Sequence, residues 1–127
     1  MHRLDLRFDA TAEAVGQARA QVVAFARHHE CADPQDVALA VTEAVTNAVV
    51  HAYRGAERGL MRVVACVRPA YLLVVVRDYG CGMSPNPDSP GAGLGLSVIG
   101  ALAAEMNIER PADGGTRLRI RFPGVER

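Results

Sequence analysis

The sequence contains no lysine, and this absence excludes two large classes of phosphate-binding site. All 14 residues counted as lysine or arginine are arginine. A P-loop needs a lysine on the β- and γ-phosphates, and a eukaryotic-type protein kinase needs a lysine on one of its strands. Any phosphate that binds this chain must therefore be held by backbone N–H groups, by a metal ion or by arginine.

The chain also lacks a long apolar run, a net charge and a cysteine pattern. No stretch approaches the roughly 18 apolar residues that span a bilayer, and the N-terminus has no apolar signal core, so we expect a cytoplasmic protein without membrane contact. A formal net charge of +0 gives no electrostatic footprint for DNA or RNA. Cys31, Cys66 and Cys81 are widely spaced and odd in number, which predicts free thiols rather than a disulfide framework or a zinc cluster.

What is present fits one ordinary globular domain. The chain has 127 residues, of which 50% are hydrophobic and 22% are charged, so it can build one core. We find no internal repeat and no low-complexity segment. The sequence therefore predicts a single domain over residues 1–127.

Periodic patterns divide this domain into regular elements. Polar and apolar residues alternate at both ends of the chain, as in half-buried strands. Thr11 and Asp33 are typical N-cap residues, and each precedes a segment with helical spacing of apolar residues. We expect strands at 3–8, 60–67, 71–77, 107–110 and 116–122, helices at 12–29, 34–53 and 94–105, and a loop over 79–93.

The arrangement of these elements predicts an α+β fold. The two middle strands form a hairpin across residues 68–70. Helices beside such strands favour a two-layer sandwich, in which a mixed, mostly antiparallel sheet is covered by helices on one face. The alternation of Arg117, Arg119 and Arg121 in the last strand predicts that the other face is solvated or meets a partner.

The first motif places three polar side chains on one helix face. Glu43, Asn47 and His51 lie at positions i, i+4 and i+8. An asparagine oxygen suits Mg²⁺, which is a hard cation, and a glutamate one turn away can orient or deprotonate an attacking hydroxyl. A solvated helix face explains the same residues, and His51 fits a surface or capping position as well as a phosphate contact.

The second motif runs from Asp78 to Gly82, at the end of an apolar strand. A carboxylate there could accept a hydrogen bond from an exocyclic amine such as adenine N6. Gly80 and Gly82 would let the backbone turn sharply and approach a flat ring. Taken alone, the motif is more often a plain Asp-x-Gly turn.

The third motif places Gly91, Gly93 and Gly95 before an apolar helical run. Glycines in this position expose backbone N–H groups and direct a helix N-terminus toward anions. The motif is not a Rossmann fingerprint, because that sequence follows a strand within a βαβ unit. Farther along the chain, Thr116 could donate its hydroxyl to phosphate or simply begin a strand.

In this order and spacing, the motifs resemble those of the GHKL ATPase superfamily. Residues 43–47 resemble its N box, residues 78–82 its first glycine box, residues 91–96 its second, and Gly115–Thr116 its late phosphate contact. The segments VTEAVTNAVVHAY, VVVRDYGCGM and GLGLSVIGALA are similar to anti-sigma-factor serine/threonine kinases within that superfamily. The resemblance covers about residues 4–122 and implies the histidine-kinase-like ATPase fold.

The resemblance implies an enzyme that uses ATP and Mg²⁺ and works as a homodimer. Such a protein sequesters a sigma factor and phosphorylates a STAS-domain anti-anti-sigma factor on serine or threonine. By position, Glu43 would be the general base, Asn47 the Mg²⁺ ligand and Arg19 a partner contact. The implied ATP contacts are Asn47, His51, Asp78, Gly80, Gly82, Gly91, Gly93, Leu94, Gly95, Leu96 and Thr116.

Three other functions stay open at this point. The chain could be a non-catalytic ATP-binding switch that regulates a partner such as a phosphatase. It could be the ATP-binding part of a two-component histidine kinase, which ranks lower because only residues 1–11 precede the first expected helix. It could also be an α+β domain that binds no nucleotide, although the joint occurrence of the motifs argues against this.

Overall fold

The computed structural model describes residues 3–52, 59–79, 99–103 and 105–124. Residues 99–102 are helical. The other elements, in chain order, are β1 (Arg3–Asp9), α1 (Ala12–His29), α2 (Pro34–Asn47), the π-helical segment η1 (Ala48–Ala52), β2 (Leu60–Val67), β3 (Tyr71–Asp78), β4 (Glu105–Glu109) and β5 (Thr116–Pro123).

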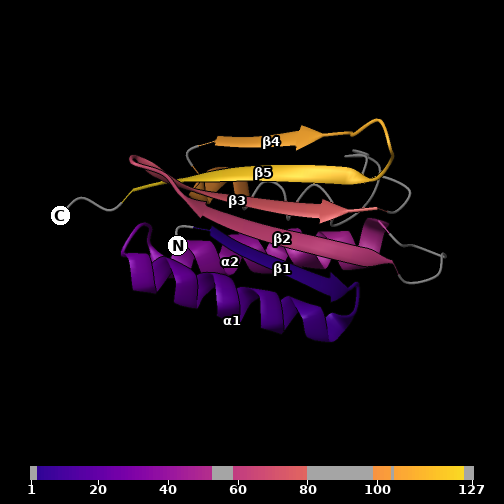
Figure 1. Cartoon of the computed structure of the whole chain (residues 1–127), viewed down its shortest axis with the longest axis horizontal. Coiled ribbons are helices and arrows are strands. Elements are labelled where there is room, and N and C mark those ends of the chain that lie inside the picture. Colours follow the sequence, from indigo (N-terminus) through magenta and orange to yellow (C-terminus); the bar gives the residue numbers. More distant parts are fainter. Residues whose placement is uncertain (1–2, 53–58, 80–98, 104, 125–127) are drawn as a thin grey trace.

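The strands form a five-stranded sheet in the order β1-β2-β3-β5-β4. Each pair of neighbours in this sheet is antiparallel, and the expected hairpin is present as β2 and β3. Figure 1 shows α1 and α2 packed side by side against one face of the sheet. The predicted α+β two-layer fold is confirmed.

Local sequence signals explain where the two long helices begin. The Thr11 hydroxyl accepts a hydrogen bond from the Ala14 backbone N–H at 3.3 Å. The Asp33 carboxylate accepts one from the Gln35 backbone N–H at 2.9 Å, and Pro34 occupies the first turn, where its missing N–H costs nothing. Both predicted N-caps are confirmed.

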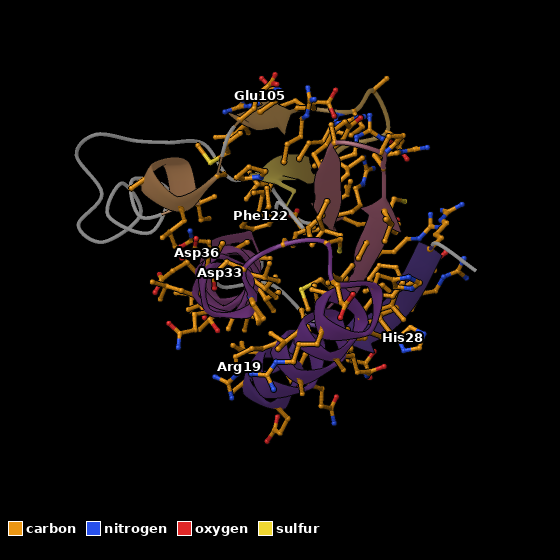
Figure 2. All side chains as sticks on the ribbon, turned by 90° about the vertical axis from the view of Figure 1, so that its left-hand side faces the viewer. Arg19, His28, Asp33, Asp36, Glu105 and Phe122 are labelled. Carbon is orange, nitrogen blue, oxygen red and sulfur yellow. The ribbon has the colours of Figure 1, made fainter. Side chains whose placement is uncertain are left out.

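The core lies between the helices and the covered face of the sheet. Val22 of α1 and Val41 of α2 are completely buried, as are Val74 of β3 and Ile120 of β5. Figure 2 shows Phe122 in this layer, between the sheet and the helices. Each fully buried side chain of this size stabilises the fold by roughly 1.5–3 kcal/mol, so this layer fixes which face of the sheet is covered.

One predicted helix end is wrong. The third helix was expected to reach residue 105, but β4 already begins at Glu105, because Met106 and Ile108 alternate with polar residues and pair with β5. The predicted strand at 107–110 corresponds to β4, which starts two residues earlier. The second helix was expected to run to about residue 53, and helical structure does continue to Ala52, although it changes from α2 to the π-helical η1 after Asn47.

Cys31 and Cys66 are free thiols, as predicted, whereas Cys81 lies outside the described residues. Burial raises the pKa of the Cys31 thiol above its ordinary value of 9.0, so this side chain stays protonated at neutral pH. Within the described parts of the chain, no helix combines the length and the apolar character needed to cross a membrane.

Candidate functional site

Three elements bring predicted site residues to one end of the sheet. There α2 and β3 end and β5 begins, and η1 packs against β3 (Figure 1). The end of an antiparallel strand adjoins the start of its neighbour, so the last residue of β3 meets the first of β5. Asn47, Asp78 and Thr116 are the terminal residues of these three elements.

Asp78 and Thr116 form the centre of this site. They are direct partners in the register of β3 and β5, and each is only 1% exposed. Both residues have interaction partners in the structure, as burial of a carboxylate requires. The pair provides a hydrogen-bond acceptor and a hydroxyl at the same place in the sheet. An amine-bearing ring and a phosphate are ligands of matching chemistry.

Gly115 fits closely against the backbone of Asp78. Its φ is +74°, a left-handed conformation that glycine adopts without strain. A Cβ at this position would lie 2.1 Å from the Asp78 carbonyl oxygen. Gly115 was predicted only by resemblance. The adjoining Gly114 is also at positive φ, and the Gly-Gly pair is the local sequence signal of a constrained turn.

Asn47 supplies a buried amide at the end of α2. Its side chain is 5% exposed, and its Nδ2 has no hydrogen-bond partner among the described residues. The two ends of an amide are nearly the same size, so the group can turn by 180° and present Oδ1 at this unpaired position. An oxygen ligand for a hard cation therefore fits the site.

The described residues contain no group of three or more His, Cys, Asp and Glu side chains that could hold a metal ion. Mg²⁺ commonly keeps several waters and takes only one or two protein oxygens in addition to substrate phosphates. Asn47 is the described residue that would serve as such a ligand.

Glu43 lies one helical turn before Asn47 and is half-buried. Both residues belong to the regular part of α2, so their side chains share one face of the helix. The helix widens into η1 directly after Asn47, and π-helical turns of this kind are frequent at functional sites. His51 lies in η1, and its predicted contact stays a prediction.

The remaining predicted positions divide into two groups. Arg19 is exposed on α1 and points away from the sheet (Figure 2), so it lies outside the site at the end of β3. The other positions lie outside the described residues, and their predicted contacts stay predictions: Gly80, Gly82, Gly91, Gly93, Leu94, Gly95 and Leu96.

Comparisons with known proteins identify the family and the fold of the chain. Residues 8–122 match the family described as "Histidine kinase-like ATPase domain". No curated protein matches the chain. A similar solved structure is the ATP-binding domain of PrrB from Mycobacterium tuberculosis, with 22% sequence identity and a TM-score of 0.56 over 96% of this chain and 98% of that chain. That likeness supports the fold.

The family match spans nearly the whole chain and includes the positions of Asn47, Asp78 and Thr116. Asp78 and Thr116 are paired in the register of β3 and β5, and Asn47 ends α2 directly before η1, which contacts β3. The chain belongs to the histidine kinase-like ATPase family, the ATP-binding fold of the GHKL superfamily.

Proposed function

We propose that the chain is an ATP-dependent protein serine/threonine kinase that sequesters a sigma factor and phosphorylates a STAS-domain antagonist of that factor. The proposal is supported by the buried pair of Asp78 and Thr116 at the end of the sheet where α2 ends at Asn47 and η1 contacts β3. Family membership supports ATP as the nucleotide, and the similar mycobacterial structure is itself an ATP-binding domain.

Each of the described site residues would have a separate role in nucleotide binding. Asp78 would accept a hydrogen bond from the adenine amine, and Thr116 would donate its hydroxyl to a phosphate. Asn47 would hold Mg²⁺ through its amide oxygen. When bound, this ion neutralises charge on the phosphates. Because the chain has no lysine, the rest of the phosphate charge would be met by arginine and by backbone N–H groups.

Glu43 would act on the protein substrate. The oxygen of the acceptor serine or threonine forms a bond to the γ-phosphorus while the bond from that phosphorus to the β,γ-bridging oxygen breaks. Glu43 takes the hydroxyl proton, and ADP leaves with the bridging oxygen. Glu43 is half-buried on α2, so its carboxylate can accept such a proton and still contact the surface of a protein substrate.

The exposed side chain of Arg19 supports a partner contact on α1. It forms no ion pair with the described residues, so its charge is available to an acidic surface. Homodimerisation belongs to the same proposal and rests on the family resemblance.

The test is transfer of radiolabelled phosphate from ATP to a purified STAS-domain antagonist. We expect acid-stable label on serine or threonine, and a transfer rate about 100-fold lower in Glu43→Ala, with ATP affinity unchanged. Glu13→Ala, an exposed glutamate in the first turn of α1, is the matched control and should transfer at the wild-type rate.

Three results would overturn the proposal in different ways. Wild-type transfer by Glu43→Ala would remove Glu43 as the base. ATP-dependent binding of the antagonist without any phosphoprotein would assign the chain as a non-catalytic switch. Acid-labile label on the chain itself, after incubation with ATP alone, would indicate histidine phosphorylation.

A further inference from the structure

One face of the sheet is not covered by α1 and α2, and it is rich in arginine. Figure 2 shows the helices on one side of the sheet and many nitrogen-tipped side chains on the other. In β5 the residues facing the core alternate with Arg117, Arg119 and Arg121. The proposed ATP site uses the opposite side of β3, since Asp78 and Arg77 are consecutive and point to opposite faces.

A cavity of about 400 Å³ lies on this uncovered face. Five arginines line it, contributed by β1, β2, β3 and β5: Arg3, Arg62, Arg77, Arg117 and Arg119. Asp113 is the carboxylate that lines it among the described residues. A guanidinium group offers planar pairs of donors that match carboxylate and phosphate oxygens, so the lining favours an anionic ligand.

Arg77 is the most constrained of these arginines. Its side chain is only 9% exposed, and its Nη2 donates to the Asp113 carboxylate at 2.9 Å and to the Gly114 carbonyl at 3.1 Å. Its guanidinium also lies over the Tyr79 ring, 4.6 Å from the centroid. Its buried Nε has no hydrogen-bond partner within the described parts of the chain. An unused charged donor is costly at such a position, and an anion beside the guanidinium would offset its positive charge.

The charges around the cavity do not cancel. Asp113 pairs with Arg77, Glu109 pairs with Arg117, and Asp5 is shared between Arg3 and Arg62. Arg119 is exposed and forms no ion pair among the described residues. The five arginines thus exceed the three nearby carboxylates by two positive charges. A phosphate monoester carries about −1.5 to −2 charges at neutral pH, which matches this excess.

A second pocket, of about 430 Å³, adjoins the arginine cavity and is less polar. It is lined by Leu60, Met61 and Arg7, and it shares Arg62 and Tyr79 with the arginine cavity. Leu60 is exposed although it is a large apolar side chain. An apolar group carried by the anion would cover this surface.

We propose that the uncovered face of the sheet is a binding site for a small phosphate monoester. The phosphate occupies the arginine cavity, where it pairs with the positive charge of the Arg77 guanidinium and accepts hydrogen bonds from Arg119. The organic part of the ester lies in the adjoining pocket against Leu60 and Tyr79. This site is separate from the proposed ATP site and does not depend on it.

The test uses phenyl phosphate and inorganic phosphate as probes on the full chain. Calorimetry should show saturable binding of both, with phenyl phosphate binding more tightly because of the apolar pocket. In ¹H–¹⁵N spectra, the Arg77 Nε–H resonance should shift on titration. Arg119→Gln should weaken binding about tenfold, because one charged hydrogen bond is lost at an exposed position that the fold does not need.

Arg121→Gln is the matched control, because Arg121 lies on the same strand and face but pairs with Glu105 and does not line the cavity. It should bind phenyl phosphate as the wild type does. Equal weakening in both variants would show a nonspecific charge effect and overturn the site. Weakening in Asn47→Ala with no change in Arg119→Gln would place the anion at the ATP site instead. Failure of the wild type to bind phenyl phosphate would also refute the proposal.

Discussion

At the scale of single residues, Gly115 is the position where the site tolerates least change. A side chain there would meet the Asp78 carbonyl oxygen and would also be held at a φ of +74°. Gly114 has a φ of +98°, but a methyl group added there would meet nothing within 4 Å, and Gly100 has open space without a positive φ. Alanine substitutions at these three glycines therefore distinguish the destabilisation caused by backbone strain from that caused by steric clash.

We predict a graded loss of stability across the three alanine substitutions. Gly115→Ala should destabilise the fold by about 2–4 kcal/mol, because strain and clash add. Gly114→Ala should cost about 1–2 kcal/mol from the backbone conformation alone, and Gly100→Ala should be neutral or stabilising by up to about 1 kcal/mol. Denaturant unfolding measures all three. Equal effects of Gly115→Ala and Gly114→Ala would show that the contact with Asp78 does not constrain the site.

The site residues were predictable only in part from the sequence. Asp78 and Asn47 belong to recognisable motifs. The end of a predicted strand located Asp78, and helical spacing located Asn47. Arg77 gave no signal, because its burial and its contact with Asp113 depend on how β3 pairs with β5. Interactions that arise from register between distant segments leave no local pattern.

At the scale of elements, local patterns predicted the strands and the helix starts well. Alternation defines β1 and β5, and the capping residues Thr11 and Asp33 define the starts of α1 and α2. The end of α1 at His29 was also predicted, but the end of the third helix was not. The start of β4 at Glu105 follows no strong local breaker, so its pairing with β5 decides it. The change to η1 at Ala48 has no local signal either.

The turn between β4 and β5 is tied to β3 by the ion pair of Asp113 and Arg77. The hydrogen bond from Arg77 holds the pKa of Asp113 below its ordinary value of 3.8. A carboxyl group whose pKa is lowered in the folded state stabilises that state at higher pH. This stabilisation is lost as the pH falls through the folded-state pKa.

We therefore predict a pH-dependent difference between wild type and Asp113→Asn. At neutral pH the variant should melt at a slightly lower temperature, because Asp113 is exposed and solvent screens the pair. The two melting temperatures should converge as the pH falls below 3.8. Thermal unfolding followed from neutral pH to about pH 2.5 makes the comparison. A difference that persists unchanged at the acid end would mean that the variant loses packing rather than an ionic contact.

At the scale of the whole molecule, the net charge is zero, but the charged side chains are unevenly distributed over the surface. The helices on the covered side carry Glu13, Asp36 and Glu43 against Arg19 and Arg27, whereas the uncovered face of the sheet gathers most of its charge from arginine. Composition alone gave no sign of this, because it averages over both faces. The sequence predicted the α+β layers and one uncovered face, but the arginine cavity on that face follows from strand order.

The same arrangement keeps two sets of polar residues apart. The residues proposed to bind ATP lie at one end of the sheet on its covered side, at the termini of α2, β3 and β5. The arginine cavity faces the other way. Effects of a substitution in one set should therefore not appear in the ligand binding of the other.

Calorimetric binding of ATP, ADP and adenosine, with and without Mg²⁺, to wild type and Asn47→Ala tests whether Asn47, Asp78 and Thr116 form a nucleotide site. We expect the wild type to bind ATP more tightly with Mg²⁺. We also expect Asn47→Ala to lose this Mg²⁺-dependent affinity while it still binds adenosine, since Asp78 is intact. Equal losses for ATP and adenosine would contradict the role of Asn47 as the metal ligand, and a wild type that binds no nucleotide would contradict the site itself.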